Sequence, residues 1–223
     1  WSADKSSIRF VPEYFGYGCE CPIFSYATCG IKFDTKNEEL VKKAHKGLVN
    51  FESISVRDNI SKRKMQKVLP KKKIEKVLDP TLLNPFFKYQ GMLESDEKYV
   101  LLYGQHYSEK QIAFIKRYAK TLKCKIYAVG WKQDWSDKFV NTNSGEELQK
   151  VFAQSIFCFP STFHGTIFSI INHKQFLSML NPLRGKKVEL LLNDLSLQNR
   201  IFNDDMEMED LGEIDYEKVE NIL

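Results

Sequence analysis

The sequence predicts an α/β protein built from two Rossmann-like units, on three observations. Short apolar runs of strand length alternate with segments whose apolar residues recur at helical spacing. Several of these runs end in glycine or in a polar side chain, as buried parallel strands do. A stretch without periodicity, 84–98, separates two such series. The first series has only three strands, few for a doubly wound sheet, so we expect its amino-terminal half to be truncated.

The first unit is predicted to span 1–84, as the carboxyl-side part of a Rossmann-like domain. Leu40, Val41, Ala44 and Leu48 share one face at helical spacing and indicate a helix. Pro80 is expected to end the third strand of this unit. In order, we expect a strand at 22–28, a helix at 36–48, a strand at 51–56, a basic helical stretch and a strand at 76–83.

A linker is predicted at 85–97, and the second Rossmann-like domain at 98–223. Glycines end its first two strands, and Ser144 followed by Glu147 fits a capping box. The predicted elements are a strand at 99–103, a helix at 109–122, a strand at 125–129, a polar loop at 131–143, a helix from 144, a strand at 156–159, a helix to 172, a strand at 175–180, and helices at 186–194 and from 216.

The composition is that of an ordinary globular protein, with 43% hydrophobic and 28% charged residues. No apolar run is long enough for a transmembrane helix, and no signal peptide is apparent, so we expect a cytoplasmic protein. The chain opens on Trp1 in a polar stretch, which suggests a fragment. The five cysteines lack the spacing of a zinc site and are expected to be reduced thiols: Cys19, Cys21, Cys29, Cys124 and Cys158.

The charge is unevenly distributed, although the net value is only +4 at pH 7. Residues 62–76 carry eight basic side chains and one acid, whereas acidic residues crowd 204–220. The basic run could contact anionic lipid headgroups, a pyrophosphate or nucleic acid, or it could be a solvated helix face. No aromatic residue interleaves with it, which argues against single-stranded nucleic acid.

The segment 159–168 (F-P-S-T-F-H-G-T-I-F) follows an apolar strand and continues with helical spacing. His164 and Gly165 then lie near the amino end of a helix, at the sheet edge where open α/β proteins bind ligands. A histidine there suggests proton transfer to an anionic substrate. It could equally be a helix-start histidine bonded to a backbone carbonyl.

Arg57 follows the second strand and could hold a carboxylate or phosphate by a two-pronged pair. It could instead form a salt bridge with Asp58 or Asp79. Asp79 in turn could cap a turn or orient Arg57. Gly104 ends a strand in the second unit, as a turn close to a ligand requires, although most such glycines are merely turns.

Three segments, in this order, resemble the polysaccharide pyruvyl transferase family. S-I-S-V-R-D at 53–58 is similar to its serine-valine-arginine-acid motif, and V-L-D-P-T-L-L at 77–83 to its aspartate-proline-threonine strand. T-F-H-G-T-I-F-S at 162–169 resembles its serine-phenylalanine-histidine-glycine block. The chain departs from the family pattern at Ser161, where an acidic residue is usual, and at 28–30, where T-C-G replaces an asparagine- or serine-rich loop.

The resemblance implies a glycosyltransferase B-like fold with the active site in a cleft between two domains. Such enzymes move pyruvate from phosphoenolpyruvate onto two hydroxyls of a sugar, in a polysaccharide or its lipid-linked precursor, and form a cyclic ketal. Arg57 would bind the phosphoenolpyruvate anion and His164 would act as general acid. No metal and no cofactor are expected. The other residues expected at the substrate are Phe163, Gly165, Thr166, Asp79 and Gly104.

Two other functions stay open. A nucleotide-sugar glycosyltransferase shares the layout and would need a carboxylate for the ribose, for which Glu146 or Glu147 could serve. A non-catalytic scaffold with the same fold could dock on membranes through 62–76. For the enzyme we expect phosphoenolpyruvate and a sugar or lipid-linked oligosaccharide as partners, with no nucleic acid. The basic run would give peripheral contact with the inner membrane face.

Overall fold

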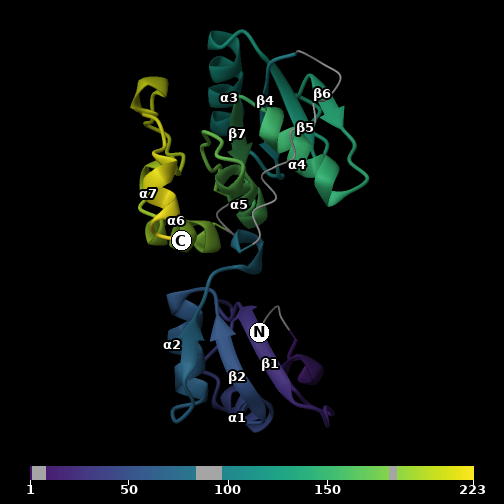
Figure 1. Ribbon diagram of the computed structural model, residues 1–223, viewed down its shortest axis with the longest axis vertical. Coiled ribbons are helices and arrows are strands. Elements are labelled where there is room, and N and C mark those ends of the chain that lie inside the picture. Colours follow the sequence, from purple (N-terminus) through teal and green to yellow (C-terminus); the bar gives the residue numbers. More distant parts are fainter. Residues whose placement is uncertain (2–8, 84–96, 181–184) are drawn as a thin grey trace. The chain divides into compact units, whose positions relative to one another are not determined.

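The structure, a computed structural model, describes residues 1, 9–83, 97–180 and 185–223. The chain divides into two compact units, Trp1–Leu83 and Asn84–Leu223, and each contains its own parallel sheet (Figure 1). The predicted α/β class with parallel strands is thereby confirmed. All of the predicted linker except residue 97 lies outside the described residues.

The first unit is a three-stranded sheet in the order β1-β2-β3, with both of its α-helices packed into one apolar core. That core joins Leu40 and Ala44 of one helix and Met65 of the other to Ile54 of the central strand. Phe24, on the first strand, is 66% exposed. The elements are η1 (Pro12–Phe15), β1 (Ile23–Thr28), α1 (Glu38–Leu48), β2 (Phe51–Val56), α2 (Asn59–Val68) and β3 (Ile74–Lys76).

The third strand lies earlier than predicted. It covers Ile74–Lys76 rather than 76–83 and pairs with the end of β2, where Val56 lies opposite Lys76. The chain then leaves the sheet, and Pro80–Leu82 forms a 3-10 turn, η2, capped by Asp79. Proline at a first helical position loses no hydrogen bond, so the residues that seemed to stop a strand instead begin this turn.

The second unit has a four-stranded parallel sheet in the order β6-β5-β4-β7. Helix α3 packs through Phe114 on the face that carries Val100, while the other face carries Tyr103, whose ring contacts Phe152 of α4 and Phe168 of α5. The elements are β4 (Tyr99–Tyr103), α3 (Glu109–Thr121), β5 (Lys125–Val129), β6 (Lys138–Val140), α4 (Gly145–Gln154), β7 (Phe157–Pro160), α5 (Phe163–Ile171), α6 (Lys186–Asp194), η3 (Gln198–Arg200), η4 (Met208–Asp210) and α7 (Tyr216–Glu220).

Two predictions in this unit were wrong. The polar loop at 131–143 contains β6, whose three residues pair with β5. The strand is too short for a recognisable apolar pattern. The stretch 175–180 forms only isolated bridges, Cys158↔Phe176 and Ser178↔Ile201. It lies between two different partners, and neither pairing is long enough to make a regular strand.

The capping box predicted at α4 forms only in part. Ser144 Oγ accepts a hydrogen bond from Glu147 N at 3.1 Å, but the Glu147 carboxylate accepts from Asn143 N at 2.6 Å. The reciprocal box that was expected there occurs instead at α3, between Ser108 and Gln111. Both patterns satisfy amide groups that a helix start leaves without internal partners.

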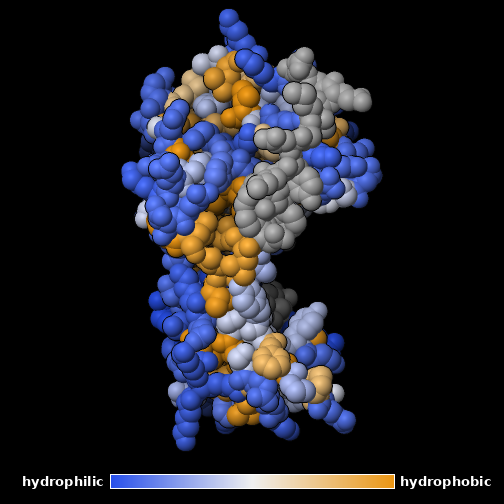
Figure 2. Space-filling view, viewed as in Figure 1, coloured by the Kyte–Doolittle hydropathy of each residue, from blue (hydrophilic) through white to orange (hydrophobic). Residues whose placement is uncertain are grey.

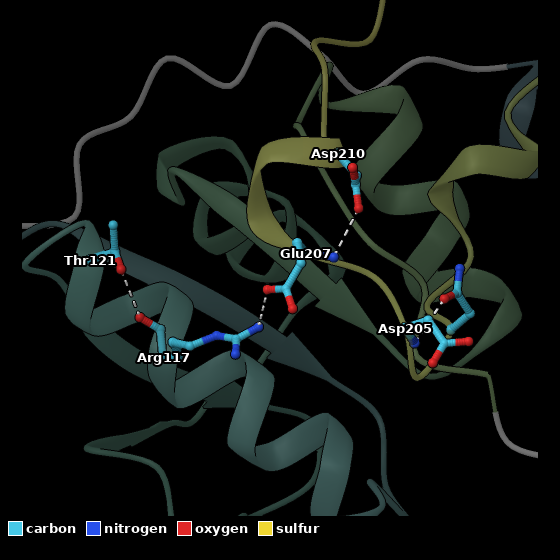
Figure 3. A network of polar contacts seen from close by, with 6 residues as sticks. Arg117, Thr121, Asp205, Glu207 and Asp210 are labelled. Carbon is cyan, nitrogen blue, oxygen red and sulfur yellow. Dashed lines mark hydrogen bonds and ion pairs between the residues drawn. The ribbon is translucent and has the colours of Figure 1, made fainter.

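The acidic tail binds basic residues of its own unit. Lys110 Nζ lies 2.6 Å from Asp204, and Arg117 Nη2 lies 2.9 Å from Glu207. Figure 3 shows Arg117 of α3 reaching Glu207, whose amide donates in turn to Asp210 at 2.9 Å. Exposed ion pairs of this kind each contribute roughly 0–1 kcal/mol. Two acidic residues of the tail, Asp204 and Glu207, are therefore paired with basic side chains of α3.

The basic run 62–76 consists of two kinds of residue. Lys64 donates to the carbonyls of Ile31 and Phe33, and Lys72 to those of Val49 and Phe51, so both are structural. The surface over α2 is hydrophilic (Figure 2). The run's exposed basic side chains are Lys62, Arg63, Lys67, Lys71 and Lys73. Among the described residues, no helix is both long and apolar enough to cross a bilayer.

Candidate functional site

Arg57 lies at the carboxyl edge of the first sheet, where parallel α/β sheets place their ligand-binding groups. Its amide donates to Thr28 O, the last residue of β1, at 3.2 Å. Its Nη1 lies 2.5 Å from Asp79 Oδ2. The Arg57 side chain is 21% exposed and that of Asp79 is 5% exposed, so Arg57 is partly accessible while its partner is buried.

Asp79 performs both of the roles that the sequence left open. One oxygen accepts from Arg57, and the other, Oδ1, accepts from Thr81 N at 3.1 Å. The cap holds the carboxylate in place, and the carboxylate holds the guanidinium. Arg57 is thus positioned by a residue that is itself fixed by the η2 turn.

Asp58, the other partner considered for Arg57, caps α2 instead. Its two oxygens accept from Ser61 N and Ser61 Oγ, each at 2.7 Å. Ser61 Oγ also accepts from Gly30 N at 2.7 Å. This buried network joins the loop after β1 to the start of α2, directly beside Arg57 in the chain.

The carboxyl end of β1 is irregular, which the sequence analysis did not find. The pairing with β2 shifts between Ser25 and Thr28, and Ala27 has a φ of 50° although it is not glycine. Ser55 bridges the gap, because its Oγ donates to Ser25 O at 2.9 Å and accepts from Ala27 N at 3.1 Å. Strained backbone of this kind is often found at functional sites.

His164 is the second residue of α5 in the other unit, at the carboxyl edge of its own sheet. Thr162 caps the helix, with its Oγ1 accepting from Gly165 N at 3.0 Å. The imidazole is exposed, and its ring lies 5.5 Å from that of Phe163 and 6.3 Å from that of Phe168. The amino end of a helix carries partial positive charge, which favours an anion beside this histidine.

Gly104 and Ser161 join the two loops that flank this helix start. Ser161 Oγ accepts from Gln105 N and donates to Gln105 O, both at 2.9 Å. Gly104 has a φ of 145°, and a Cβ there would lie 2.0 Å from Ser161 Oγ. Gln133 Nε2 donates to Gly104 O at 2.9 Å, which brings in the loop after β5. Only glycine fits this crossing, and the two hydrogen bonds of Ser161 to Gln105 hold it in place.

Gly165 is needed for the ring of Tyr103. A Cβ at position 165 would lie 2.7 Å from Tyr103 Cδ1 and 2.9 Å from Pro160 Cβ. The Tyr103 ring also meets that of Trp131 edge-on at 5.2 Å, and burial raises the pKa of its phenol. The Tyr103 ring therefore packs against the start of α5 as a neutral group.

Thr166, in the first turn of α5, has a fully buried side chain. Its Oγ1 donates to Thr162 O at 3.2 Å and lies 3.0 Å from Ser178 Oγ. These contacts fix the first turn of α5 against the segment that follows it. Thr166 supports the helix start on which His164 is carried.

The carboxylates considered for a nucleotide ribose have local partners. Glu146 pairs with Lys150 at 3.4 Å, and Glu147 accepts from Asn143 N. Both are exposed at the start of α4. Among the residues that the structure describes, no cluster of three His, Cys, Asp or Glu side chains could hold a metal ion.

The structure thus gives two candidate sites, each at the carboxyl edge of its own sheet. One presents a guanidinium held by a buried carboxylate, and the other presents an imidazole at a helix start. The first suits an anion, and the second suits proton transfer beside an anion.

The chain has been compared with known proteins. No curated protein matches the sequence closely enough to count as a relative. The family model described as polysaccharide pyruvyl transferase matches residues 10–182, well over half of the chain. The match includes Arg57, Asp79, Gly104 and His164. The chain therefore belongs to the polysaccharide pyruvyl transferase family.

Proposed function

We propose that this protein transfers pyruvate from phosphoenolpyruvate to two hydroxyls of a sugar and forms a cyclic ketal. The acceptor would be a polysaccharide unit or its lipid-linked precursor. The observation that carries the proposal is the family match, which covers both candidate sites. Family membership supports a transferase acting in polysaccharide biosynthesis, and the donor and the product are parts of the proposal.

The chemistry requires one anion site and one proton donor. Protonation of the donor's methylene carbon places positive charge on its second carbon, which a sugar hydroxyl then attacks. Phosphate leaves, and a second hydroxyl closes the ketal. The donor's bound carboxylate lies close to the developing charge and makes it tolerable. The enol phosphate supplies the driving force, so the proposal includes no resident cofactor or metal.

Arg57 and His164 fill these two roles in the proposal. Arg57, held by Asp79 at 2.5 Å, would bind the carboxylate or phosphate of phosphoenolpyruvate. His164 would give its proton to the methylene carbon or to the departing phosphate, and would then accept one from a sugar hydroxyl. Phe163 would lie beside the substrate, with Gly104, Gly165 and Thr166 shaping the backbone around it.

The test separates binding from turnover. Phosphate release from phosphoenolpyruvate is measured with a panel of sugar acceptors, and donor binding is measured by calorimetry. Arg57→Ala should weaken donor binding roughly tenfold to a hundredfold, because a charge-assisted contact contributes about 1.5–3 kcal/mol. His164→Asn should bind the donor normally but lose about 10²–10⁴-fold in kcat.

A double variant tests whether both residues serve the same donor molecule. If they do, the loss in activation free energy of the double variant, calculated from kcat/KM, should depart from the sum of the two single losses. His45→Asn is the matched control, because His45 is exposed on α1 and should leave turnover unchanged. Near-normal turnover in both Arg57→Ala and His164→Asn would show that the role assignments are wrong.

Contact with the membrane is a separate part of the proposal. Five exposed basic side chains on and after α2 could meet anionic headgroups near a lipid-linked acceptor. Structural use of Lys64 and Lys72 reduces the run's available charge but does not abolish it.

A further inference from the structure

Cys19 and Cys21 form an exposed pair of thiols in the first unit. Their sulfur atoms lie 3.1 Å apart, and both residues are solvent-exposed. The pair precedes β1 at its amino end, whereas Arg57 follows β2 at the carboxyl edge of the sheet. No candidate catalytic residue described above uses these thiols.

We propose that Cys19 and Cys21 are a thiol–disulfide exchange site, which a small disulfide such as oxidised glutathione converts to an intramolecular disulfide. The inference does not depend on the proposed transfer activity. It rests on the distance between the two sulfurs, on their exposure, and on the different surroundings of the other three cysteines.

The distance makes ring closure accessible. A disulfide needs the sulfurs at about 2.05 Å, roughly 1 Å closer than they are here. Two residues separated by one other cannot have Cα atoms much more than about 7 Å apart. Gly18, just before the pair, has a φ of 75° and open space around it, so the segment has room to adjust. Cys21 lies in a bend.

The surroundings make the reaction selective. Cys158 is 1% exposed, and burial raises the pKa of its thiol to about 11, so it stays protonated and unreactive. Burial also raises the pKa of Cys124, and Cys29 is only partly exposed. A hydrogen bond with Cys19 raises the pKa of Cys21 as well, so exposure and the nearby second sulfur, and not a lowered pKa, distinguish this pair from the other cysteines. Of the five cysteines, all of which the structure describes, only Cys19 and Cys21 are exposed.

The reaction balances in two exchange steps. A thiolate of the pair attacks one sulfur of the small disulfide, forming a mixed disulfide and releasing one small thiolate. The neighbouring thiol loses its proton to water, and its sulfur attacks the protein sulfur of the mixed disulfide. The second small thiolate then leaves. Two protein thiols are oxidised, and one small disulfide is reduced to two thiols.

The experiment equilibrates the reduced full chain anaerobically in glutathione buffers of increasing oxidised fraction. Remaining thiols are labelled with N-ethylmaleimide and counted by mass spectrometry. The wild-type chain should lose two labels together, lose the mass of two hydrogens, and yield a peptide linked between Cys19 and Cys21. Cys19→Ser and Cys21→Ser should each instead retain one glutathione. Cys29→Ser should behave as the wild type.

A second measurement does not involve oxidation. Phenylarsine oxide, which binds paired thiols, should bind the reduced wild-type chain once and should not bind either serine variant. Persistent glutathione on the wild-type pair, disulfides between chains, or arsenical binding that survives Cys19→Ser would each overturn the proposal. Both serine substitutions lie on the surface, so folded variants are expected for every arm.

Discussion

Asp79 binds Arg57 with one carboxylate oxygen and caps the turn Pro80–Leu82 with the other. The cap is a hydrogen bond from Thr81 N at 3.1 Å, and the ion pair is 2.5 Å long. Since a single buried side chain does both, the position of the guanidinium depends on the local fold of η2. Substitutions can separate the two roles.

Asp79→Asn should keep the cap and lose the ion pair, because an amide oxygen can still accept from Thr81 N. We expect a loss of about 1–3 kcal/mol in the free energy of unfolding, measured in urea. Asp79→Ala should lose about 1 kcal/mol more, since it also removes the cap. Equal stability of the two variants would show that the cap contributes nothing.

The crossing between Gly104 and Ser161 predicts a strict requirement for glycine. Gly104→Ala should cost about 1–3 kcal/mol or more, because its φ of 145° is strained for alanine and its Cβ would lie 2.0 Å from Ser161 Oγ. Thermal unfolding measures the loss. Gly145→Ala is the matched control, because nothing lies within 4 Å of a Cβ there, and it should be neutral or stabilising by about 0.4–1 kcal/mol.

Cys158 predicts a pH dependence of stability at the alkaline end. Burial raises the pKa of its thiol from 9.0 to about 11, so the unfolded chain loses this proton at lower pH than the folded chain. The stabilisation is complete below pH 9 and is lost as the pH rises to about 11. Over that window the wild type should lose about 2 kcal/mol relative to its value at neutral pH.

Cys158→Ala is the control for this pH dependence, because it removes the titrating group. At neutral pH the variant should be less stable than the wild type, since it leaves a cavity. Its urea midpoint should nevertheless fall less steeply between pH 9 and 11 than that of the wild type. Parallel curves would contradict the assignment to Cys158.

The two kinds of lysine in 62–76 should separate in a paired experiment. Lys72→Ala should lower the free energy of unfolding by about 1–3 kcal/mol, because its ammonium donates to two backbone carbonyls. Lys67→Ala and Lys71→Ala should leave stability unchanged and weaken sedimentation with anionic vesicles by about 1 kcal/mol each at low salt. No difference between anionic and neutral vesicles would remove membrane contact from the proposal.

Much of the fold could be predicted because local patterns of apolar residues determine it. Phe51–Val56, Tyr99–Tyr103 and Lys125–Val129 have the bounds that their patterns predict, and so does the helix Lys186–Asp194. Tyr99–Tyr103 and Lys125–Val129 are nearly continuous apolar runs, as is typical of buried parallel strands. Strand β6 could not be found this way, because its pairing with β5 decides its structure.

The sequence alone determined the α/β class, the residues at the strand ends, Arg57 and His164 among them, and the resemblance that implied their roles. It could not choose between Asp58 and Asp79 as the partner of Arg57, because both are near in the chain and both can cap a turn. The choice follows from three-dimensional contacts. Asp58 accepts hydrogen bonds from Ser61, whereas the η2 turn places Asp79 against the Arg57 guanidinium. Tertiary structure likewise decided the hydrogen bonds between Ser161 and Gln105 and the short distance between the Cys19 and Cys21 sulfurs. Such contacts depend on side-chain directions and loop paths, which composition and periodicity do not encode.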